Sequence, residues 1–253
     1  MDIPETLLQR LAKANHVAVL TGAGVSAESG IKTFRDPDGL WAEFNPAELA
    51  SVDGFMSNPE LVWSWYQHRV EVVNNAKPNP GHYAIAKMQN LFPKFSLITQ
   101  NVDRLHHRAG SEKVIELHGN IVENHCFDCK EPFHGETNLP DKKLPVCPRC
   151  GGRIRPSVVW FGEMLPVDAL EAAEEAAYTS DVFFSVGTSA EVYPAANLPV
   201  AAKRAGAYVV EVNPNITVLS SYVDAKLPLP SGEALPILLE EFRKYQKFYD
   251  ELL

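Results

Sequence analysis

The sequence predicts an α/β fold in which a doubly wound parallel sheet carries a smaller module formed by two insertions. Short apolar runs rich in Val, Ile and Phe recur along the chain, and segments with helical periodicity lie between them. Such runs without polar alternation are typical of strands buried on both faces, and their alternation with helices is typical of a parallel sheet. Two long stretches that lack this pattern predict the smaller module.

Six apolar runs are the predicted strands, and each is followed by Gly, Asn, Asp or Thr. In chain order they begin at His16, Phe95, Val114, Ser157, Asp181 and Ala207. Helical periodicity covers residues 4–14, 82–90, 167–177, 195–205 and 233–253. Because ligands of a doubly wound sheet bind at the carboxyl ends of its strands, we expect the functional site to lie where these runs end.

The two stretches without strand–helix alternation are predicted to fold together as one small domain. Residues 36–80 show short helical patterns, including one at 59–73, and residues 121–157 contain all the cysteines together with prolines and glycines. We therefore assign residues 36–80 and 121–157 to the small domain. The sheet domain then consists of residues 1–35, 81–120 and 158–253.

Composition and charge exclude several classes of protein. The 253 residues are 45% hydrophobic and 22% charged, which allows a large core and excludes global disorder. With 23 Lys and Arg against 32 Asp and Glu, the net charge of −9 argues against a direct nucleic-acid partner. No apolar run reaches the roughly 18 residues of a membrane helix, and the N-terminus lacks a secretory pattern. We expect a soluble, cytoplasmic protein with no membrane partner.

All four cysteines lie in two CxxC pairs, Cys126 with Cys129 and Cys147 with Cys150, separated by seventeen residues. This spacing is typical of a zinc ribbon, because two residues between thiolates let both reach one tetrahedral ion. Disulfides and unrelated free thiols are the alternatives; disulfides are rare in the cytosol, and chance clustering is improbable. Four cysteines fill a tetrahedral shell, so we predict one structural zinc ion in a zinc-ribbon insertion.

A glycine-rich turn follows the first predicted strand directly. Residues 22–27 (GAGVSA) match the G-x-G-x-x-G/A pattern of Rossmann-like folds, in which glycines let the backbone approach a pyrophosphate. The alternative is a plain glycine turn at a strand end. The acidic strand end expected about 20 residues later is missing. A bound dinucleotide must therefore have its ribose held by other residues.

Polar side chains end two further predicted strands. Gln100, Asn101 and Asp103 follow one buried run, where a polar ligand would compensate their burial, although they could instead cap a helix at 104–109. His118 ends the next run and is followed by a glycine. Seven other histidines compete with it, but this position favours His118 as a general base acting on a ribose hydroxyl.

Taken together, these motifs resemble those of the sirtuins, the NAD-dependent protein lysine deacylases. The resemblance covers about residues 10–240, and its motifs occur in the family's order: 22–35, 99–110, 117–119, both CxxC pairs, 158–163, 187–189 and 212–214. The sequence is most similar to the bacterial and archaeal class III type, a group that also contains desuccinylases.

The resemblance implies transfer of the acyl group of acyl-lysine to ADP-ribose, with release of nicotinamide. It implies deacetylation, and also desuccinylation or demalonylation, of protein or peptide substrates. His118 and Asn101 would be catalytic. The NAD-binding residues would be Gly22, Ala23, Gly24, Ser26, Glu28, Phe34, Arg35, Trp41, Gln100, Asn101, Asp103, Gly187, Thr188, Ser189, Asn213 and Ser231.

The resemblance also implies where the acyl-lysine substrate binds. Residues 159–163, including Val159, Phe161, Gly162 and Glu163, would pair with the substrate backbone as an added β-strand. Tyr66 and Arg69, three residues apart on one helix face, would line the acyl pocket, where a guanidinium can bind a carboxylate bidentately. Ala50 would leave that pocket wide. The alternative for the Tyr66–Arg69 pair is an ordinary amphipathic surface helix.

Two other functions remain possible at this point. One is an NAD(P)-dependent dehydrogenase with a structural zinc ribbon, which would reduce the nicotinamide instead of releasing it. The other is a zinc-ribbon nucleic-acid-binding protein. The ribbon contains several Lys and Arg residues, but acidic residues lie among them and no continuous basic stripe is present.

Overall fold

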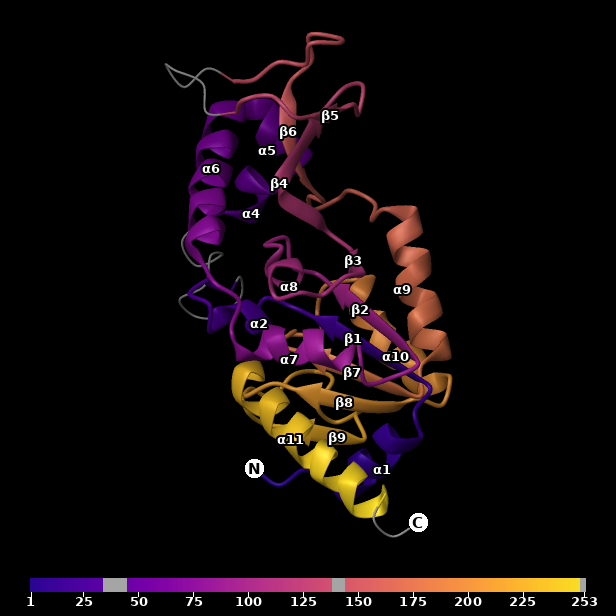
Figure 1. Cartoon of the computed structure of the whole chain (residues 1–253). Coiled ribbons are helices and arrows are strands. Elements are labelled where there is room, and N and C mark those ends of the chain that lie inside the picture. Colours follow the sequence, from indigo (N-terminus) through magenta and orange to yellow (C-terminus); the bar gives the residue numbers. More distant parts are fainter. Residues whose placement is uncertain (34–44, 138–143, 251–253) are drawn as a thin grey trace.

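The computed structural model of the chain describes residues 1–33, 45–137 and 144–250. A parallel sheet covered by helices forms the lower part of the molecule in Figure 1, and a small antiparallel sheet with its own helices forms the upper part. Among the described residues, no helix is both long and apolar enough to cross a bilayer.

The large sheet confirms the predicted fold class. Its strands are β1 (His16–Thr21), β2 (Lys94–Thr99), β3 (Val114–Glu116), β7 (Val182–Val186), β8 (Tyr208–Val212) and β9 (Ala225–Leu227). Their order is β3-β2-β1-β7-β8-β9, and every neighbouring pair is parallel. Counted along the chain this is the 3-2-1-4-5-6 order of Rossmann-like folds. The direction of the order reverses between β1 and β7, where such folds bind their ligands.

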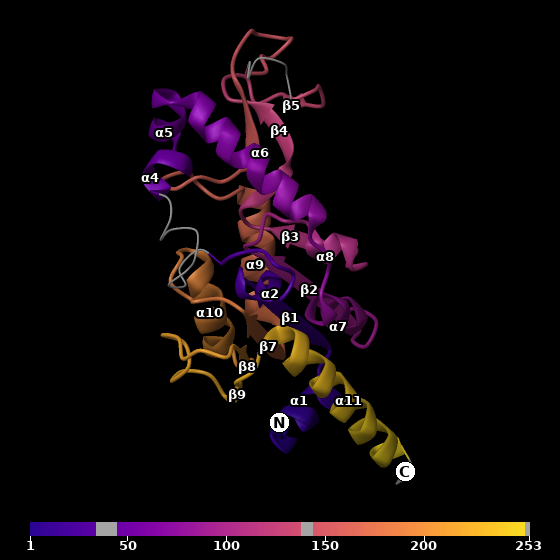
Figure 2. The same ribbon diagram turned by 90° about the vertical axis from the view of Figure 1, so that its left-hand side faces the viewer.

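Each face of the large sheet has its own hydrophobic core. Along β1, Val17 and Val19 pack on one face, whereas Ala18 and Leu20 pack on the other. The first face is covered by α1 (Glu5–Lys13), α7 (Pro80–Met88) and α11 (Ser231–Asp250), the second by α9 (Val167–Thr179) and α10 (Leu198–Arg204). Figure 2 shows α7 and α11 on the side of the sheet opposite α10. Burial on both faces explains the unbroken apolar sequence of β1.

The two insertions share a third core. Helices α4 (Pro46–Leu49), α5 (Val52–Ser57) and α6 (Pro59–Asn75) come from the first insertion. They pack on a three-stranded antiparallel sheet of β4 (Gly119–Cys126), β5 (Pro132–Phe133) and β6 (Ile154–Val158), in the order β5-β4-β6. Phe55, Trp63 and Tyr66 of the helices belong to one hydrophobic cluster with Cys126 and Ile154 of the ribbon and with Trp160, which follows β6.

Four strands differ from the sequence prediction. The run beginning at Ser157, expected in the parallel sheet, belongs to β6, which ends at Val158 and pairs antiparallel with β4. The prediction also missed β5, which has only two residues, β9, which has three, and β4, whose polar second half has little strand periodicity. A buried apolar run has the same sequence pattern in a parallel and in an antiparallel sheet. The sequence therefore could not show to which of the two sheets β6 belongs.

Candidate active site

The loops after β1 and β7 contact each other backbone to backbone at the topological switch point. The N–H of Gly22 donates to the carbonyl of Val186 at 3.0 Å, and that of Gly24 donates to Gly187 O at 2.8 Å. A Cβ atom on either Gly22 or Gly24 would lie 2.8 Å from Gly187 O. Gly187 itself has a φ of +61°. Close packing therefore requires glycine here, and the helix that follows, α2 (Gly24–Ala27), is a single turn.

A cavity of about 870 Å³ lies at this edge of the sheet and is also lined by Tyr66 and Arg69 of the first insertion and by residues 158–163, which follow the second insertion. Its size is typical of a small-molecule site. The predicted residues that line it are Gly22, Ala23, Gly24, Glu28, Tyr66, Arg69, Gln100, Asn101, His118, Val159, Phe161, Gly162, Glu163, Gly187, Thr188, Ser189, Asn213 and Ser231. Ala50 lines it too. Phe34, Arg35 and Trp41 lie outside the described residues.

Ser26 and Asp103 are buried behind Asn101 and are not among the residues that line the cavity. Ser26 Oγ donates to Asp103 Oδ2 at 2.7 Å and accepts from Asn101 Nδ2 at 3.1 Å. Asp103 Oδ1 also accepts the N–H of Leu105, the first residue of α8 (Leu105–Arg108), at 2.9 Å. Burial raises the pKa of Asp103. This network holds the Asn101 amide in place.

One ring nitrogen of His118 forms a hydrogen bond within the protein, and the other is available as a base. Its Nδ1 lies 3.0 Å from the carbonyl oxygen of Gln100. Because a carbonyl can only accept, Nδ1 carries the proton and Nε2 keeps its lone pair. Burial lowers the pKa of His118, and this effect outweighs that of the hydrogen bond to Gln100, which raises the pKa. The imidazole is therefore neutral near pH 7, as a general base must be.

Side-chain bonds tie together the loops after β2, β7 and β8. Gln100 Nε2 donates to Thr188 Oγ1 at 3.1 Å, and Asn213 Nδ2 donates to the Thr188 carbonyl at 3.1 Å. Elsewhere in the cavity wall, Glu28 Oε2 accepts the N–H of Gly232 at 2.7 Å and lies 3.4 Å from Ser231 Oγ. The Glu28 carboxylate thus lies at the N-terminus of α11, where a negative charge is favourable.

The sequence prediction missed residues 215–218, which also line the cavity. The buried carboxylate of Glu211 on β8 holds this loop by accepting from Thr217 Oγ1 and from Ser220 Oγ, the latter at 2.5 Å. Lys226 Nζ lies 3.3 Å from Glu211 Oε2 and balances its charge. The Asn-Pro-Asn turn after the predicted strand was the signal that could have identified the loop.

Tyr66 and Arg69 lie on the cavity-facing side of α6, beside Ala50. Tyr66 is only 3% exposed, which does not fit the alternative of an ordinary amphipathic surface helix. Arg69 is half-buried, with its Cζ 4.7 Å from the centre of the Trp65 ring. Burial raises the pKa of Tyr66 and lowers that of Arg69. A phenol and a guanidinium thus lie together in the cavity wall.

Residues 159–163 use most of their own N–H groups inside the chain. The N–H of Val159 donates to His118 O and that of Phe161 to Ala50 O, both at 2.9 Å. The implied pairing with a substrate strand therefore depends on carbonyl groups of this segment and on the exposed Gly162.

Glu163 was expected to bind substrate, but its carboxylate has partners within the chain. It accepts two bonds from Arg155, at 2.6 and 2.9 Å, and one from the N–H of Trp160 at 2.8 Å. Burial opposes ionisation of Glu163, but these bonds from Arg155 and Trp160 lower its pKa. Glu163 therefore anchors the turn between β6 and the following segment. The sequence prediction missed the buried Arg155.

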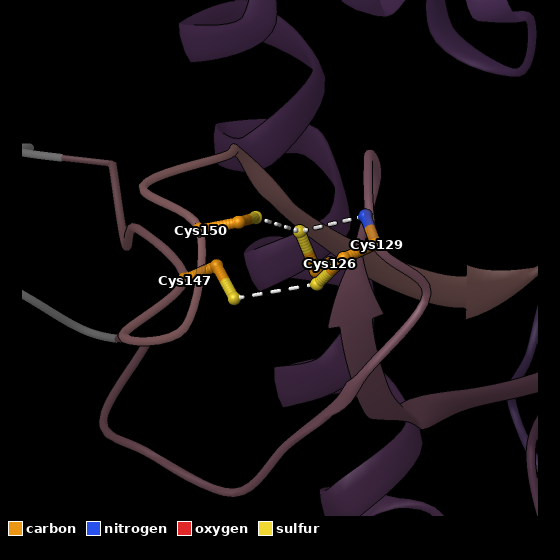
Figure 3. A group of neighbouring side chains, drawn as sticks. All are labelled: Cys126, Cys129, Cys147 and Cys150. Atoms are coloured by element: carbon orange, nitrogen blue, oxygen red, sulfur yellow. Dashed lines mark hydrogen bonds between the residues drawn. The ribbon is translucent and has the colours of Figure 1, made fainter.

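The four cysteines converge at one point in the ribbon (Figure 3). Their sulfur atoms all lie within 4.8 Å of one another, with Cys126 and Cys150 at 3.5 Å and Cys129 and Cys147 at 3.7 Å. Tetrahedral Zn–S bonds of about 2.3 Å place sulfurs roughly 3.8 Å apart, whereas a disulfide requires about 2.05 Å. The four cysteines thus fit a closed, structural zinc site, as predicted.

Comparison with known proteins agrees with these features. The Sir2 family model matches residues 22–194. The chain is 54% identical to an NAD-dependent protein deacylase of Aquifex aeolicus, over 83% of this chain and 87% of the relative. It is 49% identical to the NAD-dependent protein deacylase 2 of Pyrobaculum aerophilum, over 92% and 94% of the two chains.

Solved structures agree as well. A Sir2 homologue–NAD complex superimposes with a TM-score of 0.90 at 46% identity, covering 96% of this chain and 95% of that one. A mutant Sir2 homologue–ADP ribose complex superimposes with a TM-score of 0.92 at 45% identity, covering 97% and 98%. The Rossmann-like sheet, the cysteine cluster and these matches lead to one conclusion: the chain belongs to the Sir2 family.

Proposed function

We propose that this protein is an NAD-dependent protein lysine deacylase, which transfers the acyl group of acyl-lysine to ADP-ribose and releases nicotinamide. The observation that carries this proposal is the His118 imidazole, whose Nε2 is left as a base in the same cavity as Asn101 and the glycine loops. Relatives named NAD-dependent protein deacylases support it. So do neighbours solved with NAD, and with NAD and a p53 peptide.

Each group of residues has a distinct task in this proposal. Bound NAD supplies an electrophilic ribose carbon and a nicotinamide leaving group. The loops at Gly22 and Gly187 admit the dinucleotide close to the backbone, and Asn101, held by Ser26, orients the reacting ribose end. His118 accepts a proton at Nε2 from a ribose hydroxyl, while its bond to Gln100 keeps the ring oriented.

We further propose that the enzyme removes succinyl and malonyl groups as well as acetyl. Tyr66 and Arg69 line the cavity together with the small residue Ala50. A guanidinium can bind a carboxylate through two parallel hydrogen bonds, so it favours an acyl chain that ends in a carboxylate. Proteins or peptides that carry acyl-lysine are the proposed partners, and we expect no direct binding of nucleic acid.

The small module and the sheet are proposed to be two domains with the active cavity between them, divided as the sequence predicts. The four cysteines are not joined by disulfides, and they have the geometry of a metal site. Thiols in this state are typical of a reducing compartment, which supports the cytoplasm as the location.

One peptide carrying acetyl-, malonyl- or succinyl-lysine tests the proposal. With NAD, the enzyme should release nicotinamide and form the unmodified lysine peptide with each acyl group, and kcat/KM should compare the three. Formation of NADH, followed by its absorbance, would instead indicate a dehydrogenase. No consumption of NAD with any acylated peptide would contradict the proposed function.

A further inference from the structure

Trp160 and Tyr66 form a hydrogen bond that determines how the tyrosine hydroxyl is used. Trp160 Nε1 lies 2.9 Å from Tyr66 Oη, and the two residues are 2% and 3% exposed. An indole N–H can only donate, so the phenol oxygen is the acceptor. The hydroxyl proton of Tyr66 must then point elsewhere. The described part of the chain contains no acceptor for it, and Tyr66 lines the cavity.

The indole ring is held on two sides, which fixes the direction of its N–H. Arg155 Cζ lies 3.4 Å from the centre of the Trp160 ring, and the guanidinium binds both carboxylate oxygens of Glu163. Phe55 packs against the indole with ring centres 5.2 Å apart. A rotation of the indole would break the stacking on Arg155, so Nε1 stays directed at Tyr66.

We propose that Trp160 is a positioning residue for acyl selectivity: its N–H directs the Tyr66 proton into the cavity, where it is donated to an acyl group that ends in a carboxylate. A carboxylate only accepts hydrogen bonds, so a tyrosine that donates adds to the attraction of Arg69. Without the indole N–H, the phenol oxygen is free to accept from Arg69 and to turn its proton away. The methyl end of an acetyl group accepts no hydrogen bond and gains nothing from this arrangement.

The inference rests on the proposed function, and Trp160→Phe tests it because phenylalanine keeps a ring against Arg155 but has no N–H. We expect the ratio of kcat/KM for succinyl-lysine to that for acetyl-lysine to fall about tenfold, mainly through the KM of the succinyl peptide. General damage to the fold would lower both values and leave the ratio unchanged. In a Tyr66→Phe background, Trp160→Phe should have no further effect on the ratio.

Trp63→Phe is the matched control. Trp63 is also buried in the same cluster, but its Nε1 donates to the Ile154 carbonyl at 2.9 Å. This control should lower thermal stability and leave the acyl ratio unchanged. Should Trp160→Phe fail to fold, Tyr66→Phe, which removes the same proton and keeps every ring, must by itself lower the ratio about tenfold.

Three outcomes would overturn the inference: an unchanged ratio in Trp160→Phe, an equal fall in Trp63→Phe, or an unchanged ratio in Tyr66→Phe. If the wild-type enzyme removes both acyl groups but Trp160→Phe does not change the succinyl-to-acetyl ratio of kcat/KM, only the role of Trp160 is wrong. If the wild-type enzyme consumes no NAD with any acylated peptide, the proposed function fails and the inference fails with it.

Discussion

The imidazole of His118 donates from Nδ1 to the carbonyl oxygen of Gln100, 3.0 Å away at the carboxyl end of β2. The backbone directly after the strand thereby determines the tautomer of the neutral histidine and leaves Nε2 unprotonated, on a side chain that lines the cavity. Val159 donates to the carbonyl of His118 in turn, so the base is held between the large sheet and the segment that follows β6.

The lowered pKa of His118 predicts the acid limb of the pH–rate profile. Burial favours the neutral ring, so the ring stays a base below the ordinary value of 6.5. We expect kcat/KM to fall only as the pH drops below 6.5, measured with an acetyl-lysine peptide and saturating NAD. An acid limb centred above 6.5 would contradict this. His118→Ala should lower kcat by about 10²–10⁴-fold, whereas His134→Ala, at an exposed position in the ribbon, should not.

The buried His82 predicts a loss of stability in mild acid. Burial lowers its pKa from 6.5 to about 4, so the unfolded chain binds the proton more readily. Its contribution to stability is therefore complete above pH 6.5 and is lost as the pH falls toward 4, about 3 kcal/mol in all. Chemical denaturation at a series of pH values should show a shallower pH dependence for His82→Gln than for wild type. Glutamine retains the capping role that His82 has at the start of α7. Identical slopes would show that His82 is not the titrating group.

The cysteine cluster predicts one tightly bound zinc ion per chain, measured by elemental analysis. Cys126 and Cys147 are part of the core shared by the two insertions, so removal of the metal should destabilise that core by several kcal/mol. Cys129→Ser should bind less zinc and unfold at a lower temperature. Full thermal stability after complete chelation would show that the ion is not structural.

The position of Arg69 predicts a change of acyl preference on its removal. Arg69→Met keeps a long side chain but loses the charge, so the kcat/KM for succinyl-lysine should fall about 10–100-fold relative to that for acetyl-lysine. Arg204→Met, at an exposed position on α10, is the control and should leave the ratio unchanged. An unaltered ratio in Arg69→Met would show that the carboxylate is bound elsewhere.

The contact between the glycine loops predicts a steric effect that can be separated from backbone strain. Gly187 and Gly30 both have positive φ, but a Cβ on Gly187 would lie 2.5 Å from Val25 N, whereas one on Gly30 has nothing within 4 Å. Gly30→Ala should cost about 1–3 kcal/mol of stability through strain alone. Gly187→Ala should cost more and should also weaken NAD binding, measured by calorimetry. Equal costs would mean that the loops can separate without penalty.

The sequence predicted the main features of the fold because they depend on local patterns. Unbroken apolar runs such as residues 17–20 indicate strands buried on both faces, and the CxxC pairs indicate a metal site, because each pattern reflects one physical requirement. The fold class and the cysteine site are therefore confirmed. The assignment of the run at Ser157 to the parallel sheet was wrong, since an apolar strand does not specify its partner.

By itself, the sequence determined the fold class, the glycines that allow two loops to meet, and the cysteines that form the metal site. The tertiary structure alone decided which residues become neighbours: Ser26 with Asp103, His118 with Gln100, and Trp160 with Tyr66. Trp160 and Tyr66 are 94 positions apart, and no local periodicity records such a contact. Hydrogen-bond direction depends on geometry within a few ångströms, and only the folded chain establishes that geometry.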